Sequence, residues 1–347
     1  MVKYRPVTKE ELKFLVQDKS IYLGDIDVSL ITDMSRLFLR QKRRKFEGIE
    51  KWNMSHVTNM SGMFYGATYF NQDISGWDVS NVTDMSEMFA YTKIFNKPLY
   101  NWNVNNVKNM RNMFYKARSF NQDISDWDVS NVKNMSGMFL NAESFNQFIG
   151  NWNVSNVKYM SNMFNCATDF NQDISSWDVS KVKYMDNMFS NAIKFNQNIS
   201  SWNVSNVTDM SYMFAQASSF NQNISAWDVS NVKNMISMFG GAKSFNQPLN
   251  NWDVSNVYTM AFMFAYTKSF NQPLGNWKFN NIEDVSWMFY NAESFNQDIN
   301  NWNMSNIINV FNMFVNANSF NKKHIKDWKL PQNVIKQPMF SEKIYII

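Results

Sequence analysis

The chain has 347 residues, and its 33 Lys and Arg against 29 Asp and Glu give a formal net charge of +4. A charge this mild, without a concentrated basic face, does not indicate a nucleic-acid-binding protein, so we expect no specific nucleic-acid partner. Leu is scarce, whereas 30 Phe, 25 Met and 13 Trp fill the apolar positions, so the core must be built from large, adaptable side chains.

Segments that would direct the chain to a membrane are not visible in the sequence. No uninterrupted apolar run reaches the about 18 residues that a membrane-spanning helix needs. The stretch from Met1 to Val16 carries scattered charges and lacks the continuous apolar segment of a secretory signal peptide. We therefore expect no membrane span, and a chain that is cytoplasmic or exported by a non-classical route.

The first residues have the signature of a helix start. Thr8 is followed by Glu11 in the spacing of a capping box, and the apolar residues Leu12, Leu15 and Val16 come next. Because the terminal units of repeat proteins differ from the internal ones, we expect residues 1–25 to form an N-terminal cap.

A repeat dominates the rest of the chain. Trp recurs every 25 residues from Trp52 to Trp302, and Ile26 and Trp328 extend this column with one-residue insertions. Single units of this size bury too little apolar surface to fold alone, so such regularity predicts a stacked array. We expect about twelve repeats over residues 26–328 and a C-terminal cap over residues 329–347, which end in Ile344-Tyr345-Ile346-Ile347.

Two elements are predicted within each repeat. Val82, Met85 and Phe89 follow helical spacing, which favours a short helix, and the β-formers of Ile74–Val79 favour a short strand. Parallel pairing of such strands would stack the turns about 4.8 Å apart. The predicted fold is a right-handed, leucine-rich-repeat-like solenoid with one short parallel strand and one short helix per 25-residue turn.

Polar columns are expected to hold neighbouring turns in register. Asp78 and Asn103 begin an alternation of Asp and Asn, which halves the density of like charges while keeping hydrogen-bond acceptors in every turn. Duplication of a two-repeat unit explains the alternation equally well, and the two explanations are compatible. The recurring pair Phe70-Asn71 predicts a layer of Phe beside an Asn ladder that ties the backbones of adjacent turns.

The motifs W-D-V-S-N-V-T-D-M-S-x-M-F and F-N-Q-D-I-S, which recur across residues 26–328, resemble the variant repeat of BspA-type leucine-rich-repeat surface proteins. The resemblance implies a leucine-rich-repeat-like solenoid with a role in adhesion or protein binding at a cell surface. It implies no catalytic residues.

Catalytic and metal-binding patterns are almost absent from the sequence. His56 and His324 lie at opposite ends of the array and cannot share a site, and one Cys with two His makes no zinc motif. The Asp columns lack the glycine-rich nonapeptides of calcium-binding β-rolls. Cys166 is aligned with Ala117 and Ala142, so we expect a small buried side chain there. We expect no cofactor and no metal.

Lys occupies one position of four consecutive repeats, where other repeats have Thr, and recurs once later. We call this the lysine column: Lys108, Lys133, Lys158, Lys183 and Lys233. It would attract an acidic protein, an anionic glycan or a nucleic-acid backbone with salt-sensitive affinity. The alternative is a solvated edge on which flexible Lys side chains relax their repulsion. Tyr159 and Tyr184 lie beside this column.

Aromatic residues gather at another variable position. Tyr212, Phe262 and Trp287 stand where other repeats have small or polar residues, and such rings can anchor a partner. The alternatives are that adjacent repeats exchange residues freely on this face, or that the rings pack under the C-terminal cap. The basic run Gln41–Lys45 is expected to be a solvated loop, with a localisation signal or phosphate-binding patch as the alternative.

Together these features predict a non-enzymatic, adhesin-like scaffold that acts as a monomer and binds another protein through its repeated face. A carbohydrate-binding adhesin is the alternative, and an enzyme built on a solenoid is the third possibility. The candidate binding residues are Lys108, Lys133, Lys158, Lys183, Tyr159, Tyr184, Tyr212, Phe262 and Trp287.

Overall fold

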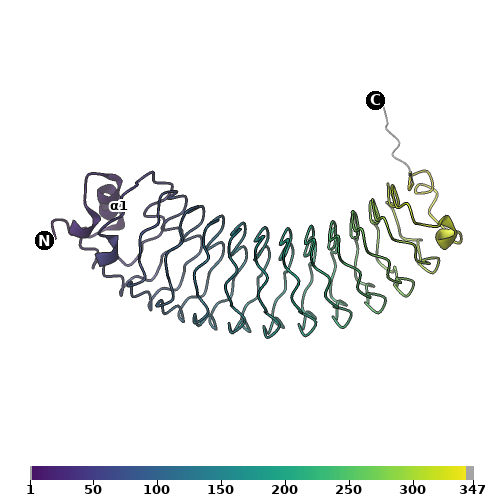
Figure 1. The fold of residues 1–347 in the computed structure, drawn as a ribbon, viewed down its shortest axis with the longest axis horizontal. Helices are drawn as coiled ribbons and strands as arrows, with labels where there is room; N and C mark the ends of the chain where they lie inside the picture. The colour runs from purple at the N-terminus through teal and green to yellow at the C-terminus, as the bar shows by residue number, and fades with distance from the viewer. Residues whose placement is uncertain (1, 341–347) are drawn as a thin grey trace, which may run out of the picture. The chain divides into compact units, whose positions relative to one another are not determined.

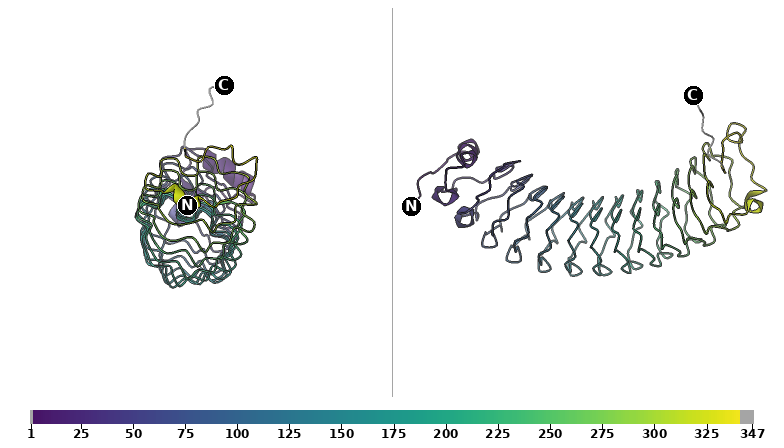
Figure 2. Two further views of the ribbon diagram at one scale, coloured as in Figure 1. Left: turned by 90° about the vertical axis from the view of Figure 1, so that its right-hand side faces the viewer. Right: turned by 45° about the horizontal axis from the view of Figure 1, so that its top comes forward.

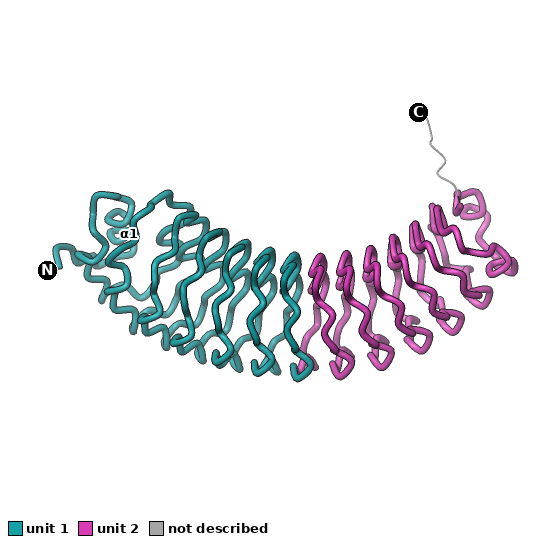
Figure 3. Tube along the Cα trace, viewed as in Figure 1, with its two compact units in different colours: residues 1–177 teal, residues 178–347 magenta. Residues whose placement is uncertain are grey.

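A computed structural model describes residues 2–340 of the chain (Figure 1). The chain divides into two compact units, residues 1–177 and 178–347, and each is a stack of similar turns (Figures 2 and 3). Regular elements within the described residues are few: helix α1 (Lys9–Gln17) and the 3₁₀ helices η1 (Leu23–Asp25), η2 (Ile49–Lys51) and η3 (Lys322–Ile325). The fold therefore depends on turns.

Helix α1 begins at the predicted capping box. Thr8 Oγ1 accepts a hydrogen bond from Glu11 N at 3.2 Å, and Glu11 Oε2 accepts one from Val7 N at 2.8 Å. The helix buries Leu12 and Val16, the apolar pair predicted from the spacing.

Arg43 attaches this N-terminal segment to the first repeats. Its guanidinium donates to the carbonyl oxygens of Val16 (3.2 Å), Asp18 (3.1 Å) and Lys45 (2.6 Å), and also to that of Ile21. Arg43 is only 3% exposed, so the expectation of a solvated loop, and its phosphate-binding alternative, is wrong for this residue. A buried cation is tolerable here because carbonyl groups surround it.

The helix predicted in each repeat is wrong. Residues 85–92 instead form overlapping β-turns, with Met88 N donating to Met85 O at 3.3 Å, Ala90 N to Glu87 O at 3.0 Å, and Thr92 N to Phe89 O at 3.1 Å. Glu87 and Tyr91 have φ values of 58° and 61°, as the third residue of a type II turn requires. Chained turns bury side chains three or four residues apart, which is why the sequence imitates a helix.

The remaining amide groups of this segment join one turn to the next. Met85 N donates to Asn109 O at 3.0 Å, and Glu87 N donates to Arg111 O at 2.8 Å. Parallel bridges such as Asp84↔Asn109 lie at this segment, and no strand forms at Ile74–Val79. The predicted strand is therefore wrong: the apolar residues of Ile74–Val79 are buried by an irregular backbone.

The Trp column is confirmed as core. Trp127 is 3% exposed, and its ring centroid lies 6.4 Å from that of Trp102 and 6.5 Å from that of Trp152. Its Nε1 donates to Leu99 O of the preceding turn at 3.0 Å. The same bond recurs in the second unit, where Trp252 Nε1 donates to Ile224 O at 3.2 Å. Each indole thus fills the core and gives a second hydrogen bond to a carbonyl that also accepts from a backbone amide, Trp102 N for Leu99 O and Trp227 N for Ile224 O.

The predicted Phe layer and Asn ladder are also confirmed. The ring centroids of Phe114 and Phe120 lie 3.9 Å apart, and both rings are fully buried. Asn96 Oδ1 accepts a hydrogen bond from Asn121 N at 3.0 Å, and Asn121 Oδ1 accepts one from Asn146 N at 2.9 Å. The side chain of one turn therefore takes the place of a backbone acceptor for the next turn.

The alternating Asp and Asn residues act as acceptors within their own turns. Asp78 Oδ1 accepts from Ser80 N at 3.0 Å, and Asn103 Oδ1 accepts from Asn105 N at 3.2 Å. Hydrogen bonds from Ser80 lower the pKa of Asp78 below its usual value. Either residue type can supply this acceptor, so the alternation costs the turns nothing.

Cys166 does not occupy the small buried position. Ala167 does, with no exposed surface, whereas Cys166 is half-buried and has a φ of 57°. The sequence alignment was one residue out of register, because Cys166 matches Tyr91 and Lys116 at a left-handed position.

At the end of the second unit, Gln337 and Pro338 make the hydrogen bonds that the backbone of a following turn would make. The amide of Gln337 donates from Nε2 to Ile308 O at 2.9 Å and accepts from Val310 N through Oε1 at 2.8 Å. Pro338 O then accepts from Asn312 N at 2.7 Å. These groups replace the backbone of a following repeat. The predicted Ile344–Ile347 part of the cap lies outside the described residues.

We predict that Trp127→Ala lowers the free energy of unfolding by about 3–5 kcal/mol, because it leaves a cavity in the core. Denaturant unfolding should also split into separate transitions, since contacts in a repeat array are local. Trp127→Phe is the control: it keeps a ring and removes only the indole hydrogen bond to Leu99 O, which still accepts from Trp102 N, so the cost should be about 0.5–1.5 kcal/mol. If Trp127→Ala has the same free energy of unfolding as the parent chain, the assignment of Trp127 to the core is wrong.

We predict that Asp78→Asn/Asp123→Asn/Asp228→Asn unfolds at lower pH than the parent. Backbone and hydroxyl groups of Ser lower the pKa of each of these carboxyls in the folded state. Their stabilisation is present above the unfolded pKa of about 3.9 and is lost as the pH falls through the folded values. Asn keeps the acceptor and does not titrate. Acid titration by circular dichroism measures the midpoint; an unchanged midpoint would contradict the assignment.

Candidate functional site

Each repeat holds two residues with left-handed backbone. The first left-handed column comprises Arg36, Gly62, Glu87, Asn112, Gly137, Asn162, Asn187, Tyr212, Ser237, Phe262, Trp287 and Asn312. The second comprises Arg40, Gly66, Tyr91, Lys116, Asn141, Cys166, Asn191, Gln216, Gly241, Tyr266, Asn291 and Asn316. Gly and Asn adopt this backbone readily, whereas bulky residues adopt it at a cost.

Three aromatic residues stand in the first column against this preference. Tyr212, Phe262 and Trp287 have φ values of 57°, 61° and 59°. A left-handed residue with a side chain costs roughly 1–2 kcal/mol, and Asn fills the same position in other repeats. The backbone therefore gives no reason for aromatic rings at these positions.

Phe262 and Trp287 come together in the second unit. Their ring centroids lie 5.5 Å apart with an interplanar angle of 7°. Trp287 also contacts Tyr290 at 4.8 Å and Phe311 at 5.8 Å between centroids. We call Phe262, Trp287, Tyr290 and Phe311 the aromatic cluster. Tyr212 lies outside it, because Ser237 occupies the intervening turn of the column.

Sequence reasoning missed Tyr290 and Phe311. Tyr290 lies three residues after Trp287, and Phe311 lies one residue before Asn312, the counterpart of Trp287 in the next turn, so neither stands in the column of Trp287. Tyr266, of the second left-handed column, adds an edge contact to Tyr290 at 5.2 Å. A search for bulky residues at all outward positions of adjacent turns would have found the group.

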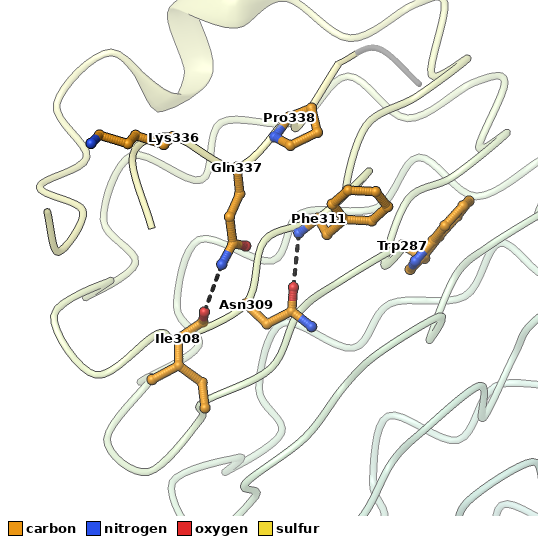
Figure 4. Close-up of a pocket in the computed structure, with 7 residues that line it drawn as sticks. All are labelled: Trp287, Ile308, Asn309, Phe311, Lys336, Gln337 and Pro338. Carbon is orange, nitrogen blue, oxygen red and sulfur yellow. Dashed lines mark hydrogen bonds between the residues drawn. The ribbon is translucent and has the colours of Figure 1, made fainter. Parts of the chain in front are cut away.

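A hollow of about 680 Å³ opens beside the cluster (Figure 4). It is lined by Trp287, Ile308, Asn309, Phe311, Lys336, Gln337 and Pro338. Asn309 Oδ1 accepts a hydrogen bond from Phe311 N at 3.1 Å, and Gln337 is fixed at both ends of its amide. The aromatic walls are therefore held by a hydrogen-bonded backbone. Trp287 lies in this hollow beside Gln337 and Pro338, as expected for a ring packed under the cap. Phe262 is 37% exposed and does not line the hollow.

The lysine column lies on the ladder that joins the turns. Within the first unit, Lys133 N donates to Lys108 O and Lys158 N to Lys133 O, each at 2.9 Å. The side chains of Lys108, Lys133 and Lys158 are exposed, and no described ion pair involves them. In-register pairing places these ammonium groups on successive turns.

Tyr159 lies beside this column in the first unit and Tyr184 in the second, each 42% exposed. In the second unit Lys183 and Lys233 are separated by Thr208, whose N donates to Lys183 O at 3.0 Å. Whether any of these residues binds a partner stays a prediction.

The repeats match the family described as "Mycoplasma protein of unknown function, DUF285", in overlapping segments covering residues 32–149, 120–227, 193–297 and 217–328. The chain belongs to this family. The overlapping matches to one DUF285 pattern agree with the tandem turns seen in each unit. No curated protein sequence matches the chain.

Solved structures similar to this DUF285 chain are distant. A TLR13–ssRNA13 complex has 11% identity, 90% coverage of this chain, 51% of that chain and a TM-score of 0.26. The Toll–Spatzle complex of Drosophila has 9% identity, 88% and 48% coverage and a TM-score of 0.25. A plant peptide hormone receptor, RGFR1 with RGF2, has 7% identity, 85% and 66% coverage and a TM-score of 0.18. The chain spans about half the length of the first two.

Residues 2–340 contain no group of three or more His, Cys, Asp or Glu side chains placed to hold a metal ion. Within the same residues, no helix has the length and apolar character needed to cross a membrane.

We predict that Lys108→Gln/Lys133→Gln/Lys158→Gln raises the free energy of unfolding at low salt by up to about 1 kcal/mol, because it removes like charges from adjacent turns of this DUF285 chain. The gain should vanish near about 1 M NaCl, where the screening length falls to about 3 Å. Denaturant unfolding at the two salt concentrations measures it. A gain that persists at high salt would show that charge repulsion is not its cause.

Proposed function

We propose that this DUF285 chain is a non-enzymatic binding scaffold that takes a protein partner on the aromatic cluster of its second unit. The observation that carries the proposal is the left-handed backbone of Phe262 and Trp287. Strained residues that the fold does not need are retained most often where a surface acts on something else. Asn187 fills the same column in an earlier turn of this unit, so the fold itself has a less costly solution.

The cluster has the composition of a binding hot spot. Trp and Tyr anchors with an apolar floor and a polar rim are typical of the centre of protein interfaces. Phe311 and Pro338 supply apolar walls to the hollow, and Asn309 and Gln337 supply amides. Lys336 is the single charged residue among those lining it. A partner would insert an apolar or aromatic side chain here and pair its own backbone with the amides.

A carbohydrate partner is the second candidate. Phe262, which is 37% exposed, leaves aromatic surface beside Trp287 against which a sugar ring can pack as well as a side chain. The resemblance to BspA-type surface proteins supports adhesion in either case. The two candidates are separated by the class of ligand that the aromatic cluster retains.

We predict that Phe262→Asn/Trp287→Asn lowers the affinity for the protein partner at least about tenfold, because it removes two interface anchors. The fold should survive, since Asn suits the left-handed backbone. Affinity capture followed by cross-linking and mass spectrometry identifies the protein partner, and titration of the purified partner measures the loss.

The control is Tyr100→Asn, which removes a ring that is 55% exposed in the first unit. It should leave binding unchanged. If the parent chain captures no protein but binds a glycan array, and Phe262→Asn/Trp287→Asn abolishes that binding, the carbohydrate candidate is favoured. Retention of the protein partner by Phe262→Asn/Trp287→Asn would overturn the proposal.

A further inference from the structure

The first unit contains a slot that sequence reasoning did not single out. It has a volume of about 350 Å³ and is lined by Arg40, Tyr65, Gly66, Thr68, Tyr91 and Lys93. None of these residues belongs to the predicted binding set, and the slot shares no residue with the aromatic cluster of the second unit. It is large enough for a small organic group.

The slot exists because one turn lacks a side chain in the second left-handed column. Gly66, with a φ of 68°, stands between Arg40 of the preceding turn and Tyr91 of the following one. A Cβ atom on Gly66 would lie 3.0 Å from Arg40 Cγ, so a larger residue would push into the slot. The missing side chain leaves an opening between a guanidinium on one side and a phenol on the other.

Three phenol rings border this region in a row. The centroids of Tyr65 and Tyr91 lie 5.2 Å apart at 46°, and those of Tyr91 and Tyr115 lie 4.9 Å apart at 72°. The hydroxyls of Tyr91 and Tyr115 form a hydrogen bond of 3.2 Å. These contacts fix the rings before any ligand arrives, which reduces the entropy cost of binding.

Positive charge surrounds the same rings. The guanidinium carbon of Arg40 lies 5.9 Å from the centre of Tyr65, and Lys116 Nζ lies 4.9 Å from the centre of Tyr91. Lys93 is exposed at the rim. No described ion pair involves Arg40, Lys93 or Lys116.

An adjacent hollow of about 240 Å³ shares Arg40 and Tyr65 with the slot. Glu87 lines that hollow together with Arg36 and Leu39. It is absent from the lining of the slot, so an anion entering between Arg40 and Tyr91 meets cations and ring faces.

We propose that this slot binds an acidic monosaccharide unit of a glycan, such as a hexuronic or sialic acid residue. The carboxylate pairs with the planar fork of Arg40, for which a bidentate carboxylate is the best-matched partner, and with Lys93. The sugar ring packs on the phenol faces of Tyr65 and Tyr91. A row of rings in successive turns suits consecutive sugars of an oligosaccharide better than one aromatic side chain of a peptide.

The test is isothermal titration of the full chain with two acidic probes, a hyaluronan hexasaccharide and 3′-sialyllactose, and with neutral lactose. At least one acidic probe should bind, and lactose should bind at least about tenfold more weakly, as expected when a charged hydrogen bond is lost. Gly66→Asn fills the slot with a residue that the same column accepts at Asn141, and Arg40→Gln removes the carboxylate partner. Each should lower the affinity at least about tenfold.

Gly241→Asn is the matched control, because Gly241 occupies the same column of the second unit with a φ of 72°. It should bind the acidic probe like the parent. The proposal is overturned if neither acidic probe binds, if lactose binds equally well, or if Gly66→Asn and Arg40→Gln leave the affinity unchanged. Binding of a tyrosine-phosphorylated peptide with no binding of either saccharide also overturns it. None of these results depends on whether the aromatic cluster of the second unit binds a protein.

Discussion

Hydrogen bonds between successive turns are the constraint on which the rest of each unit depends. A turn satisfies only some of its backbone amides internally, so its alternate amides and its indole Nε1 donate to acceptors in adjacent turns, as Met85 and Trp127 do. A buried amide or carbonyl without a partner costs about 1–3 kcal/mol, and the cost recurs in every turn. This explains why whole columns share one residue type. Trp and Asn are fixed by the hydrogen bonds that they make to the neighbouring turn, and Phe by the stacking of its ring on that turn.

The left-handed columns are where this constraint relaxes. Their backbone is dictated by the chained β-turns, but their side chains point away from the core and are free to vary from Gly137 to Trp287. Chemistry can therefore be placed there without disturbing the ladders. In the first unit the column beside Tyr65 carries cations and phenols, and in the second unit Phe262 and Trp287 carry bare aromatic surface. One scaffold thus presents two surfaces of different chemistry.

The sequence predicted the repeat, the buried Trp column, the Asn ladder and the helix start at Thr8, because each rests on a residue type recurring at one spacing. It could not distinguish chained turns from a helix, since both bury Val82, Met85 and Phe89 on one side. Cys166 was assigned to the column of small buried residues because the register of its repeat was misread by one residue. Its neighbour Ala167 occupies that column. The slot at Gly66 could not be predicted from the sequence. It forms because Gly66 has no side chain and because Arg40 and Tyr91 of the adjacent turns lie on either side of it. Phe262 and Trp287 were found because aromatic residues stand out among Asn and Ser.

The imitation of a turn by Gln337 shows that the array has a polarity. Backbone amides of the turn segment donate toward the C-terminus, whereas Trp Nε1 groups donate toward the N-terminus. The last turn consequently exposes donors that Gln337, Pro338 and Met339 accept, and the first turns need a different closure, which Arg43 helps to provide. A duplication of 25 residues inside a unit adds one copy of each hydrogen bond between turns. The first and last turns keep the same capping contacts. Such a protein can change its length by genetic recombination between repeats without new capping residues, so its reach can vary while its folding rules stay constant.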